Sequence, residues 1–180
     1  MRVWLLVAIF VLVVPFYPEA GKSDSTADPV PVQIKRILII NDSPAVLLMD
    51  GPEQHFLLVF IDFFMANAIR MGMEAPVLSR PLTHDLIGIF LRQLDAKIAK
   101  VVINDLKDNT YYAQISLEVN GRTSIIDARP SDALAIAVRH KIPVFAAPNL
   151  LRDISSIKEQ PREGDTPLPE TRKSRPRAST

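Results

Sequence analysis

Asn120 and Gly121 stand between two runs in which apolar and polar residues alternate, Tyr111–Val119 and Thr123–Ala128. Alternation with a period of two is typical of a strand with one buried face. Asn-Gly is a strong signal for a tight hairpin, because both residues tolerate the positive φ angles of a type I′ turn. The chain is therefore expected to form antiparallel strand pairs, which argues against a doubly wound parallel sheet.

Similar patterns predict the other elements. Strands are expected over residues 32–40, 46–50, 56–61, 98–104 and 144–147, and helices over 62–73, 83–94 and 130–140, with a last helical turn or two within 150–157. Asp62 and Thr83 are expected to cap the first two helices, and Ser131 or Asp132 the third. The second helix is expected to bury a stripe formed by Leu86, Phe90, Leu91 and Leu94.

The order strand, hairpin, helix occurs twice in this prediction. Ala66, Ala68 and Ile69 recur as Ala133, Ala135 and Ile136 at an offset of 67 residues, and a Pro-Val pair follows each helix. The predicted fold class is α+β, a single compact domain of antiparallel hairpins with helices, and two duplicated strand-hairpin-helix units are a hypothesis.

The two ends of the chain differ from this central part. Arg2 precedes an unbroken apolar run from Val3 to Phe16, which is shorter than the roughly 20 residues of a membrane span. Residues 1–20 are therefore expected to be a signal peptide for export to the periplasm or the exterior, with a membrane anchor over 3–16 as the alternative. Residues 21–29 are expected to be a linker, 30–153 the folded domain, and 154–180 a disordered tail rich in proline and charge.

Composition narrows the kinds of site that the chain can hold. There are no cysteines, which excludes disulfides, thiolate zinc sites and a cysteine nucleophile. The net charge is +1, and residues 30–153 contain 13 basic and 13 acidic residues. The domain thus has no broad positive field for nucleic acid, and any phosphate site must be local.

Polar residues gather at the predicted element boundaries, in the segments RPLTHDL at 80–86, VVINDLKDNTYYA at 101–113 and IDARPSDALAIAVR at 126–139. In their order and spacing these segments resemble the bifunctional nuclease domain family, over roughly residues 32–152. The resemblance implies a compact α+β domain with nuclease activity on DNA and RNA. The family usually has Ile-Gly-x-x-Glu-Ala before its first helix, where this chain has Asp62 in place of the Gly and Met65 in place of the Glu.

Phosphodiester hydrolysis requires an activated water and stabilisation of charge on the phosphoryl oxygens. Candidate catalytic residues are His84, Asp85, Asp127, Arg129 and Asp132, and Arg80 is a candidate phosphate ligand. Asp105 and Asp108 are candidate ligands for a divalent cation such as Mg²⁺ or Mn²⁺. These candidates also have purely structural interpretations. His84 would cap a helix, the 127–132 group would form an ion pair and a cap, and Arg80 would be solvated at the surface. Asp105 and Asp108 would stabilise turns.

The sequence leaves two further interpretations open. The first is a non-catalytic envelope or periplasmic module that binds a small anion, a nucleic acid or a protein, which the missing Glu and the neutral domain favour. The second is a homo-oligomer, because hairpin edges and apolar strands favour pairing between copies.

Overall fold

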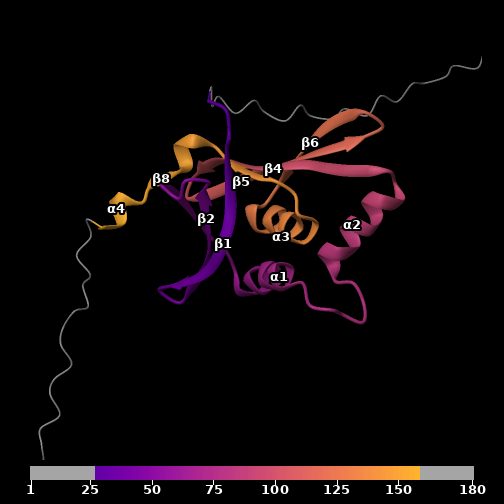
Figure 1. Cartoon of the computed structure of the whole chain (residues 1–180), viewed down its shortest axis with the longest axis horizontal. Coiled ribbons are helices and arrows are strands. Elements are labelled where there is room, and N and C mark those ends of the chain that lie inside the picture. The colour runs from indigo at the N-terminus through magenta and orange to yellow at the C-terminus, as the bar shows by residue number, and fades with distance from the viewer. Residues whose placement is uncertain (1–26, 159–180) are drawn as a thin grey trace, which may run out of the picture.

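A computed structural model describes residues 27–158 (Figure 1). The predicted signal peptide or anchor, most of the predicted linker and most of the predicted tail lie outside this range. The elements in chain order are β1 (Val30–Ile40), β2 (Ser43–Asp50), β3 (His55–Phe60), α1 (Phe63–Glu74), α2 (Thr83–Gln93), β4 (Ala96–Lys107), β5 (Thr110–Val119), β6 (Arg122–Ala128), α3 (Pro130–His140), β7 (Val144–Ala146), the 3₁₀ turn η1 (Pro148–Leu150), β8 (Arg152–Asp153) and α4 (Ser155–Lys158).

The strands of the described residues form one mixed sheet of eight strands in the order β6-β5-β4-β7-β1-β2-β3-β8. Two antiparallel meanders, β1-β2-β3 and β4-β5-β6, lie on either side of β7, which pairs antiparallel with β1 and parallel with β4. A helix follows each meander, α1 the first and α3 the second. The predicted α+β class and the repeated order of strand, hairpin and helix are confirmed.

Tight turns connect the hairpins, as the sequence predicts. Asn120 and Gly121 have φ angles of 49° and 75° between β5 and β6. Asn41-Asp42 and Asp108-Asn109 adopt positive φ in the same way between β1 and β2 and between β4 and β5. Such two-residue turns match the twist of the flanking strands and fix their register.

Helix α3 occupies the centre of the helical layer. It contacts both α1 and α2 as well as β4 and β5, and Figure 1 shows the three helices gathered on one side of the curved sheet. Most of its side chains are buried, and Ala133, Ala135 and Ala137 let its neighbours approach closely. The core beneath combines Leu134 of α3 with Leu48, Ile69 and Ile103 from β2, α1 and β4.

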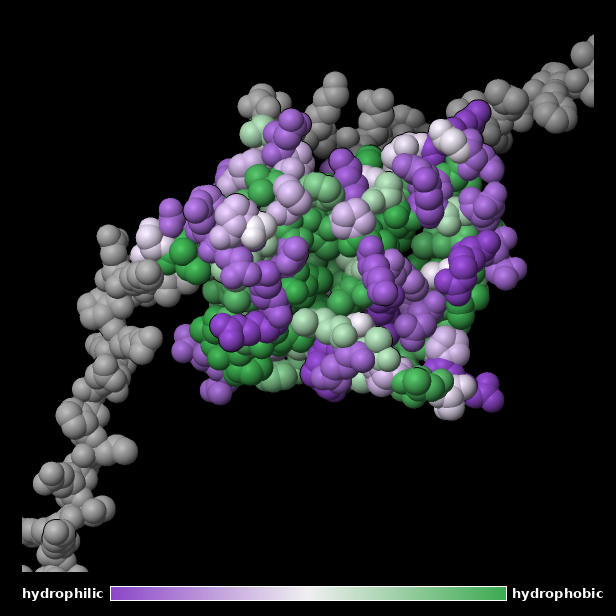
Figure 2. All heavy atoms as spheres, in the orientation of Figure 1, coloured by the Kyte–Doolittle hydropathy of each residue, from purple (hydrophilic) through white to green (hydrophobic). Residues whose placement is uncertain are grey.

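The predicted burial of the α2 stripe is wrong at three of its four positions, and the fourth, Leu91, is only partly buried. Leu86, Phe90 and Leu94 are exposed, as is Leu82 at the start of the helix, and Gly88 is the only fully buried residue of α2. The helix contacts α3 and β4 through Gly88 and its partly buried side chains, so the stripe of Leu82, Leu86, Phe90 and Leu94 faces outward. Figure 2 shows apolar side chains reaching the surface in several places on the face drawn there.

The predicted helix starts are right in part. Asp62 caps α1, and its Oδ1 accepts a hydrogen bond from the backbone N–H of Met65 at 2.8 Å. Thr83 is not a cap, because α2 begins after Leu82, whose N–H donates to Oδ2 of Asp85 at 2.8 Å. Neither Ser131 nor Asp132 caps α3, which begins after Arg129 with Pro130 in its first position.

The expected helical turns over 150–157 are also only partly right. Arg152 and Asp153 form β8, which pairs with His55 and Phe56 of β3, and α4 begins at Ser155. None of the helices within the described residues is both long enough and apolar enough to span a membrane.

Candidate active site

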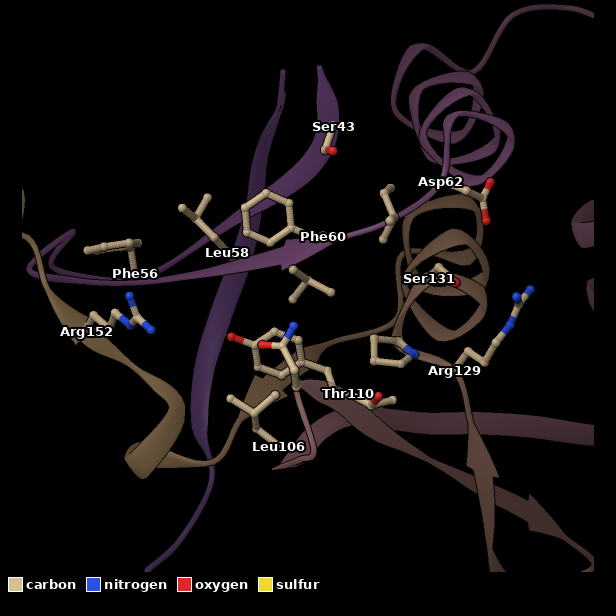
Figure 3. A pocket seen from close by; sticks show the side chains of 15 residues that line it. Ser43, Phe56, Leu58, Phe60, Asp62, Leu106, Thr110, Arg129, Ser131 and Arg152 are labelled. Carbon is tan, nitrogen blue, oxygen red and sulfur yellow. The ribbon is translucent and has the colours of Figure 1, made fainter. Parts of the chain in front are cut away.

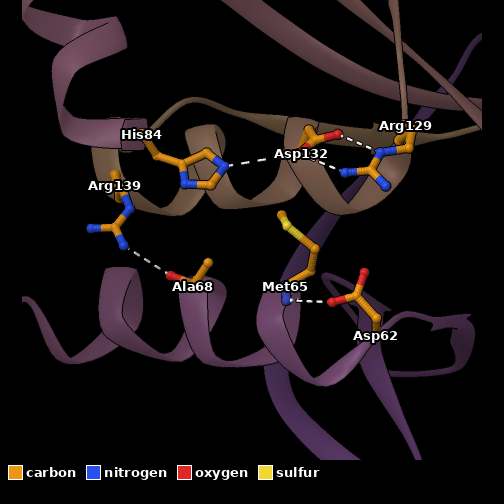
Figure 4. A network of polar contacts seen from close by, with 7 residues as sticks. All are labelled: Asp62, Met65, Ala68, His84, Arg129, Asp132 and Arg139. Atoms are coloured by element: carbon orange, nitrogen blue, oxygen red, sulfur yellow. Dashed lines mark hydrogen bonds and ion pairs between the residues drawn. The ribbon is translucent and has the colours of Figure 1, made fainter. Parts of the chain in front are cut away.

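Three of the predicted site residues meet on the surface of α3 (Figure 4). Arg129 donates from Nε to Oδ2 of Asp132 at 2.7 Å and from Nη2 to Oδ1 at 3.3 Å. Nε2 of His84, on the first turn of α2, lies 3.9 Å from the same Oδ1. That separation is too long for a direct hydrogen bond. We refer to His84, Asp132 and Arg129 as the His84 cluster.

The three side chains of the His84 cluster differ in their exposure to solvent. The side chain of Arg129 is 68% exposed, that of Asp132 is 34% exposed, and that of His84 is 14% exposed. The sequence alternative, an Asp–Arg ion pair, is thus present, but this pair lies at the surface and not in the core. Ion pairs of such exposure contribute little to stability, which leaves the two groups available to a ligand.

His84 is held in its neutral form by its surroundings. Burial lowers the pKa of His84, and the positive charge of Arg139 lowers it further, while the carboxylates of Asp132 and Asp85 partly oppose the shift. An imidazole with a pKa below its usual value is neutral at pH 7 and able to accept a proton.

Residues at the end of α3 fix α2 in place. The buried guanidinium of Arg139 donates from Nη1 to Oδ1 of Asp85 at 2.9 Å and from Nη2 to the carbonyl of Ala68 at 3.1 Å, joining α3 to both α2 and α1. His140 lies 2.9 Å through Nε2 from the backbone carbonyl of His84, so this nitrogen must be the donor. Both oxygens of Asp85 are therefore engaged, one by Arg139 and one by the start of α2.

Helix α1 supplies the two residues that depart from the family pattern. Figure 4 shows the side chain of Met65 directed from α1 toward α3 near Asp132, and it is nearly buried there. Asp62 lies one turn earlier and is occupied in capping α1. The position where the family usually has Glu thus adjoins the His84 cluster, but here it provides a thioether and no carboxylate.

A cavity of about 700 Å³ opens beside Arg129 (Figure 3). We name it the β3 cavity, because Phe56, Leu58 and Phe60 of β3 form one side of it. Its other lining includes Tyr111 of β5, Arg129 and Ser131 at the start of α3, and Arg152 of β8. Of the grouped candidates Asp127, Arg129 and Asp132, only Arg129 lines this cavity.

The other predicted residues lie apart from the cluster. Asp127 is exposed on β6, and Arg80 lies in the loop before α2, lining a separate hollow of about 350 Å³ with Asp85 and Arg139. Asp105 forms an ion pair with Lys107 at 2.6 Å, and Asp108 adopts positive φ in the β4–β5 turn. Within residues 27–158 no three His, Asp or Glu side chains come close enough to hold a metal ion.

Three residues near the site were not predicted from the sequence. Arg139 closes the third motif, but its partners come from α1 and α2, which are distant in sequence. His140 was assigned no role because it stands alone in the sequence. Arg152 reaches the cavity only because β8 pairs with β3. The one sequence signal available was the Arg139-His140 pair at the end of the predicted helix, a place where cationic side chains are common for other reasons.

Comparison with known proteins agrees with the family resemblance of the sequence motifs. Two uncharacterised proteins, from the CDC 1551/Oshkosh and H37Rv strains of Mycobacterium tuberculosis, are each 35% identical to this chain over 104 residues, covering 58% of this chain and 62% of theirs. Bifunctional nuclease 1 of Arabidopsis thaliana is 30% identical over 105 residues, covering 56% of this chain and 32% of its own length. The chain thus matches less than two thirds of the length of these relatives. The family profile of the bifunctional nuclease domain matches residues 46–159, well over half of the chain, and the protein belongs to this family.

Proposed function

We propose that this protein hydrolyses phosphodiester bonds of DNA or RNA at the His84 cluster. The observation that carries the proposal is the 3.9 Å separation of His84 Nε2 and Asp132 Oδ1 beside an exposed guanidinium. Two acceptors at that separation can both hydrogen-bond to one water molecule placed beside them. Membership of the nuclease family and the similarity to Bifunctional nuclease 1 support the same conclusion.

Each member of the cluster has a chemical role in this proposal. Neutral His84 accepts a proton from the attacking water as the water oxygen bonds to phosphorus, and Asp132 orients that water and balances the charge on the imidazolium that forms. The P–O bond to the leaving sugar oxygen breaks in the same step, and that oxygen takes a proton from solvent water. Arg129 exchanges part of its contact with Asp132 for the phosphoryl oxygens, where its planar donors match the oxyanion geometry. Asp85, Arg139 and His140 are positioning residues, because they hold α2 against α3 and touch no reacting atom.

The candidate cation ligands do not fit a metal cage. Asp105 and Asp108 lie on the β4–β5 hairpin, with Asp105 paired to Lys107, and the described residues bring no third His, Asp or Glu to them. The proposal therefore assigns no step to a cation at that hairpin, and Mg²⁺, Mn²⁺ and a chelator are variables of the experiment.

The test is cleavage by the full chain of labelled single-stranded and duplex DNA and RNA, with Mg²⁺, Mn²⁺ or chelator. Asp132→Asn, His84→Gln and Arg129→Ala are each expected to lower the rate at least 100-fold while circular dichroism stays unchanged. Arg70→Ala and Glu74→Gln are matched controls, because Arg70 and Glu74 form a comparable exposed ion pair on α1. Full activity in the three site variants would overturn the assignment.

A non-catalytic binding module is the second candidate, and Met65 is the observation that favours it. A thioether beside Asp132 cannot replace a carboxylate in proton or metal chemistry. On this alternative the wild-type chain binds nucleic acid but cleaves none, and Met65→Glu gains cleavage. The gain would show that the site is otherwise intact.

We also propose that the protein is exported, on the strength of residues 1–20 alone. Mass spectrometry of protein recovered from outside the cytoplasm is expected to show a new N-terminus near Gly21. An intact Met1 on membrane-associated protein would instead support the anchor over residues 3–16.

A further inference from the structure

The β3 cavity extends from the His84 cluster and shares Arg129 with it, while the rest of its lining has no role in the chemistry proposed above. We propose that it binds an unpaired segment of nucleic acid, with a base against Phe60 and Tyr111 and phosphates at Arg129 and Arg152. This inference rests on the proposed function and adds to it the strand state of the substrate and a second phosphate contact.

The cavity has the size and lining of a ligand site. At about 700 Å³ it falls within the range of roughly 300–1,000 Å³ that is usual for such sites. Phe56, Phe60 and Tyr111 give it an aromatic lining, and Ser43, Asn109 and Thr110 add hydroxyl and amide groups. A nucleotide combines a flat aromatic base with a charged phosphate, which match the aromatic side chains and the two arginines of the lining. Asp62, the one carboxylate of the lining, is engaged in capping α1.

Phe60 is the exposed aromatic surface of the cavity. It is 55% exposed at the end of β3, where its ring faces the hollow in Figure 3. An aromatic face of this kind stacks on any base, and by alanine substitution each such contact contributes about 1–3 kcal/mol. In a duplex the base faces are already stacked on one another. Only an unpaired base can therefore use Phe60.

Arg152 provides the charge at the other end of the cavity. Figure 3 shows it beside Phe56, far from Arg129, in agreement with the β8–β3 register that pairs Arg152 with Phe56. Within residues 27–158 no carboxylate forms an ion pair with Arg152, whereas Arg129 is paired with Asp132. Burial raises the pKa of Tyr111 and the charge of Arg152 partly opposes this, which agrees with the guanidinium lying near the cavity wall.

The two cations also limit how strongly salt affects binding. Single-stranded nucleic acid gives a slope of about −0.7 per neutralised phosphate in a plot of log affinity against log salt. Two arginine contacts therefore predict a slope of about −1.4, and one contact about −0.7. The hydroxyl and amide groups of the lining are too few to distinguish all bases, so little sequence preference is expected.

The test measures fluorescence anisotropy of labelled oligo-dT, alone or paired with oligo-dA, upon addition of the full chain at several salt concentrations. A gel after each measurement shows whether the strand is intact, so that binding and cleavage are scored separately. The wild type is expected to bind the single strand at least tenfold more tightly than the duplex.

The variants separate charge from stacking. Arg152→Ala is expected to weaken binding about tenfold and to lower the salt slope by about 0.7, while Arg122→Ala, an exposed arginine at the far end of β6, is the control. Phe60→Leu is expected to weaken binding about tenfold. Phe60→Trp is expected to keep the affinity and to lose indole fluorescence when oligo-dT is added.

Equal affinity for single strand and duplex would overturn this inference, as would an unchanged affinity and slope in Arg152→Ala. Either result leaves the proposed hydrolysis at the His84 cluster standing if cleavage is seen. Tight binding that depends on Arg152 and Phe60 but gives no cleavage would keep the inference and overturn the proposed hydrolysis. Absence of all binding to oligo-dT would overturn the inference.

Discussion

Burial is the main cause that lowers the pKa of His84, and Arg139, itself buried between three helices, adds to it. Its guanidinium lowers the pKa of His84, whereas the carboxylate of Asp132 raises it. Arg139→Gln is therefore expected to raise the pKa of His84, and Asp132→Asn is expected to lower it. NMR titration can follow the imidazole signals, because the chain has only three histidines.

The two variants are thus expected to shift the pKa of His84 in opposite directions. Removing Arg139 also frees Asp85, which reinforces the upward shift. Because Arg139 is buried, its loss is expected to destabilise the fold by about 3 kcal/mol, so the Asp132→Asn arm provides the test if the first variant unfolds. No shift in either variant would show that burial alone sets the pKa of His84, and shifts of equal sign would contradict the opposite effects of the two charges.

His84 also makes the stability of the protein depend on pH. The folded pKa of His84 lies below its usual value of about 6.5. As the pH falls from about 6.5 through the folded pKa, the unfolded chain takes up a proton that the folded chain does not, so the free energy of unfolding decreases. Above about pH 6.5 His84 contributes nothing to the slope. Urea unfolding at a series of pH values should show a shallower acid loss in His84→Gln, and an unchanged profile would contradict the assignment.

At the scale of single residues, the sequence predicts contacts within one motif but not the contacts that depend on how the helices pack. Arg129 and Asp132 are three residues apart, so a helix start brings them together without help. Arg139 and His140 meet Asp85 and His84 across 54 and 56 residues. Those contacts follow from how α2 packs on α3, which no local pattern specifies.

Helix α2 approaches α3 through a glycine, and this contact positions His84. A Cβ built on Gly88 would overlap the ring of His140, which bonds to the backbone of His84. Gly88→Ala is expected to lower the free energy of unfolding by about 1–3 kcal/mol through overpacking, although alanine is the better helix former. Any cleavage should fall with it, because α2 carries His84 away from Asp132.

The control for this variant uses a surface position of the same helix. Gln93→Ala alters helix propensity without meeting α3, since Gln93 is exposed. Thermal unfolding of both variants measures the difference. A Gly88→Ala protein as stable and active as the wild type would mean that the His140 ring moves aside freely and does not position α2.

Helix α2 shows that a periodic pattern can predict a helix without predicting which side of it is buried. Periodicity correctly predicted a helix over 83–94, which the structure has as Thr83–Gln93, and predicted a buried stripe formed by Leu86, Phe90, Leu91 and Leu94. The described fold covers the Gly88 side instead, because α3 presents the bulky His140 there and only glycine fits against it. The hairpins were predicted more completely, since a two-residue turn fixes both the pairing and the register of its strands.

At the scale of the whole molecule, the outward stripe of α2 is one apolar feature that the fold leaves exposed. Its side chains are between 37% and 69% exposed from Leu82 to Leu94. Strand β6 ends the sheet, and its Ile125 and Ile126 are exposed as well. An exposed apolar stripe along a helix is typical of an interface, and an isologous one places the same stripe on both subunits.

We expect the protein to self-associate through this stripe. In sedimentation velocity the wild type is expected to show a concentration-dependent dimer, and Phe90→Glu is expected to remain monomeric because a charge cannot be buried against a second apolar stripe. Gln93→Glu adds the same charge to the same turn without removing apolar surface, and should still dimerise. If both variants are monomeric, the charge and not the stripe is responsible, and a wild type that is monomeric at every concentration would show that α2 does not pair with its copy.

The His84 cluster lies at the opposite end of the α2 stripe from Phe90 and Leu94, so loss of dimerisation in Phe90→Glu should leave cleavage unchanged if each subunit carries a complete site.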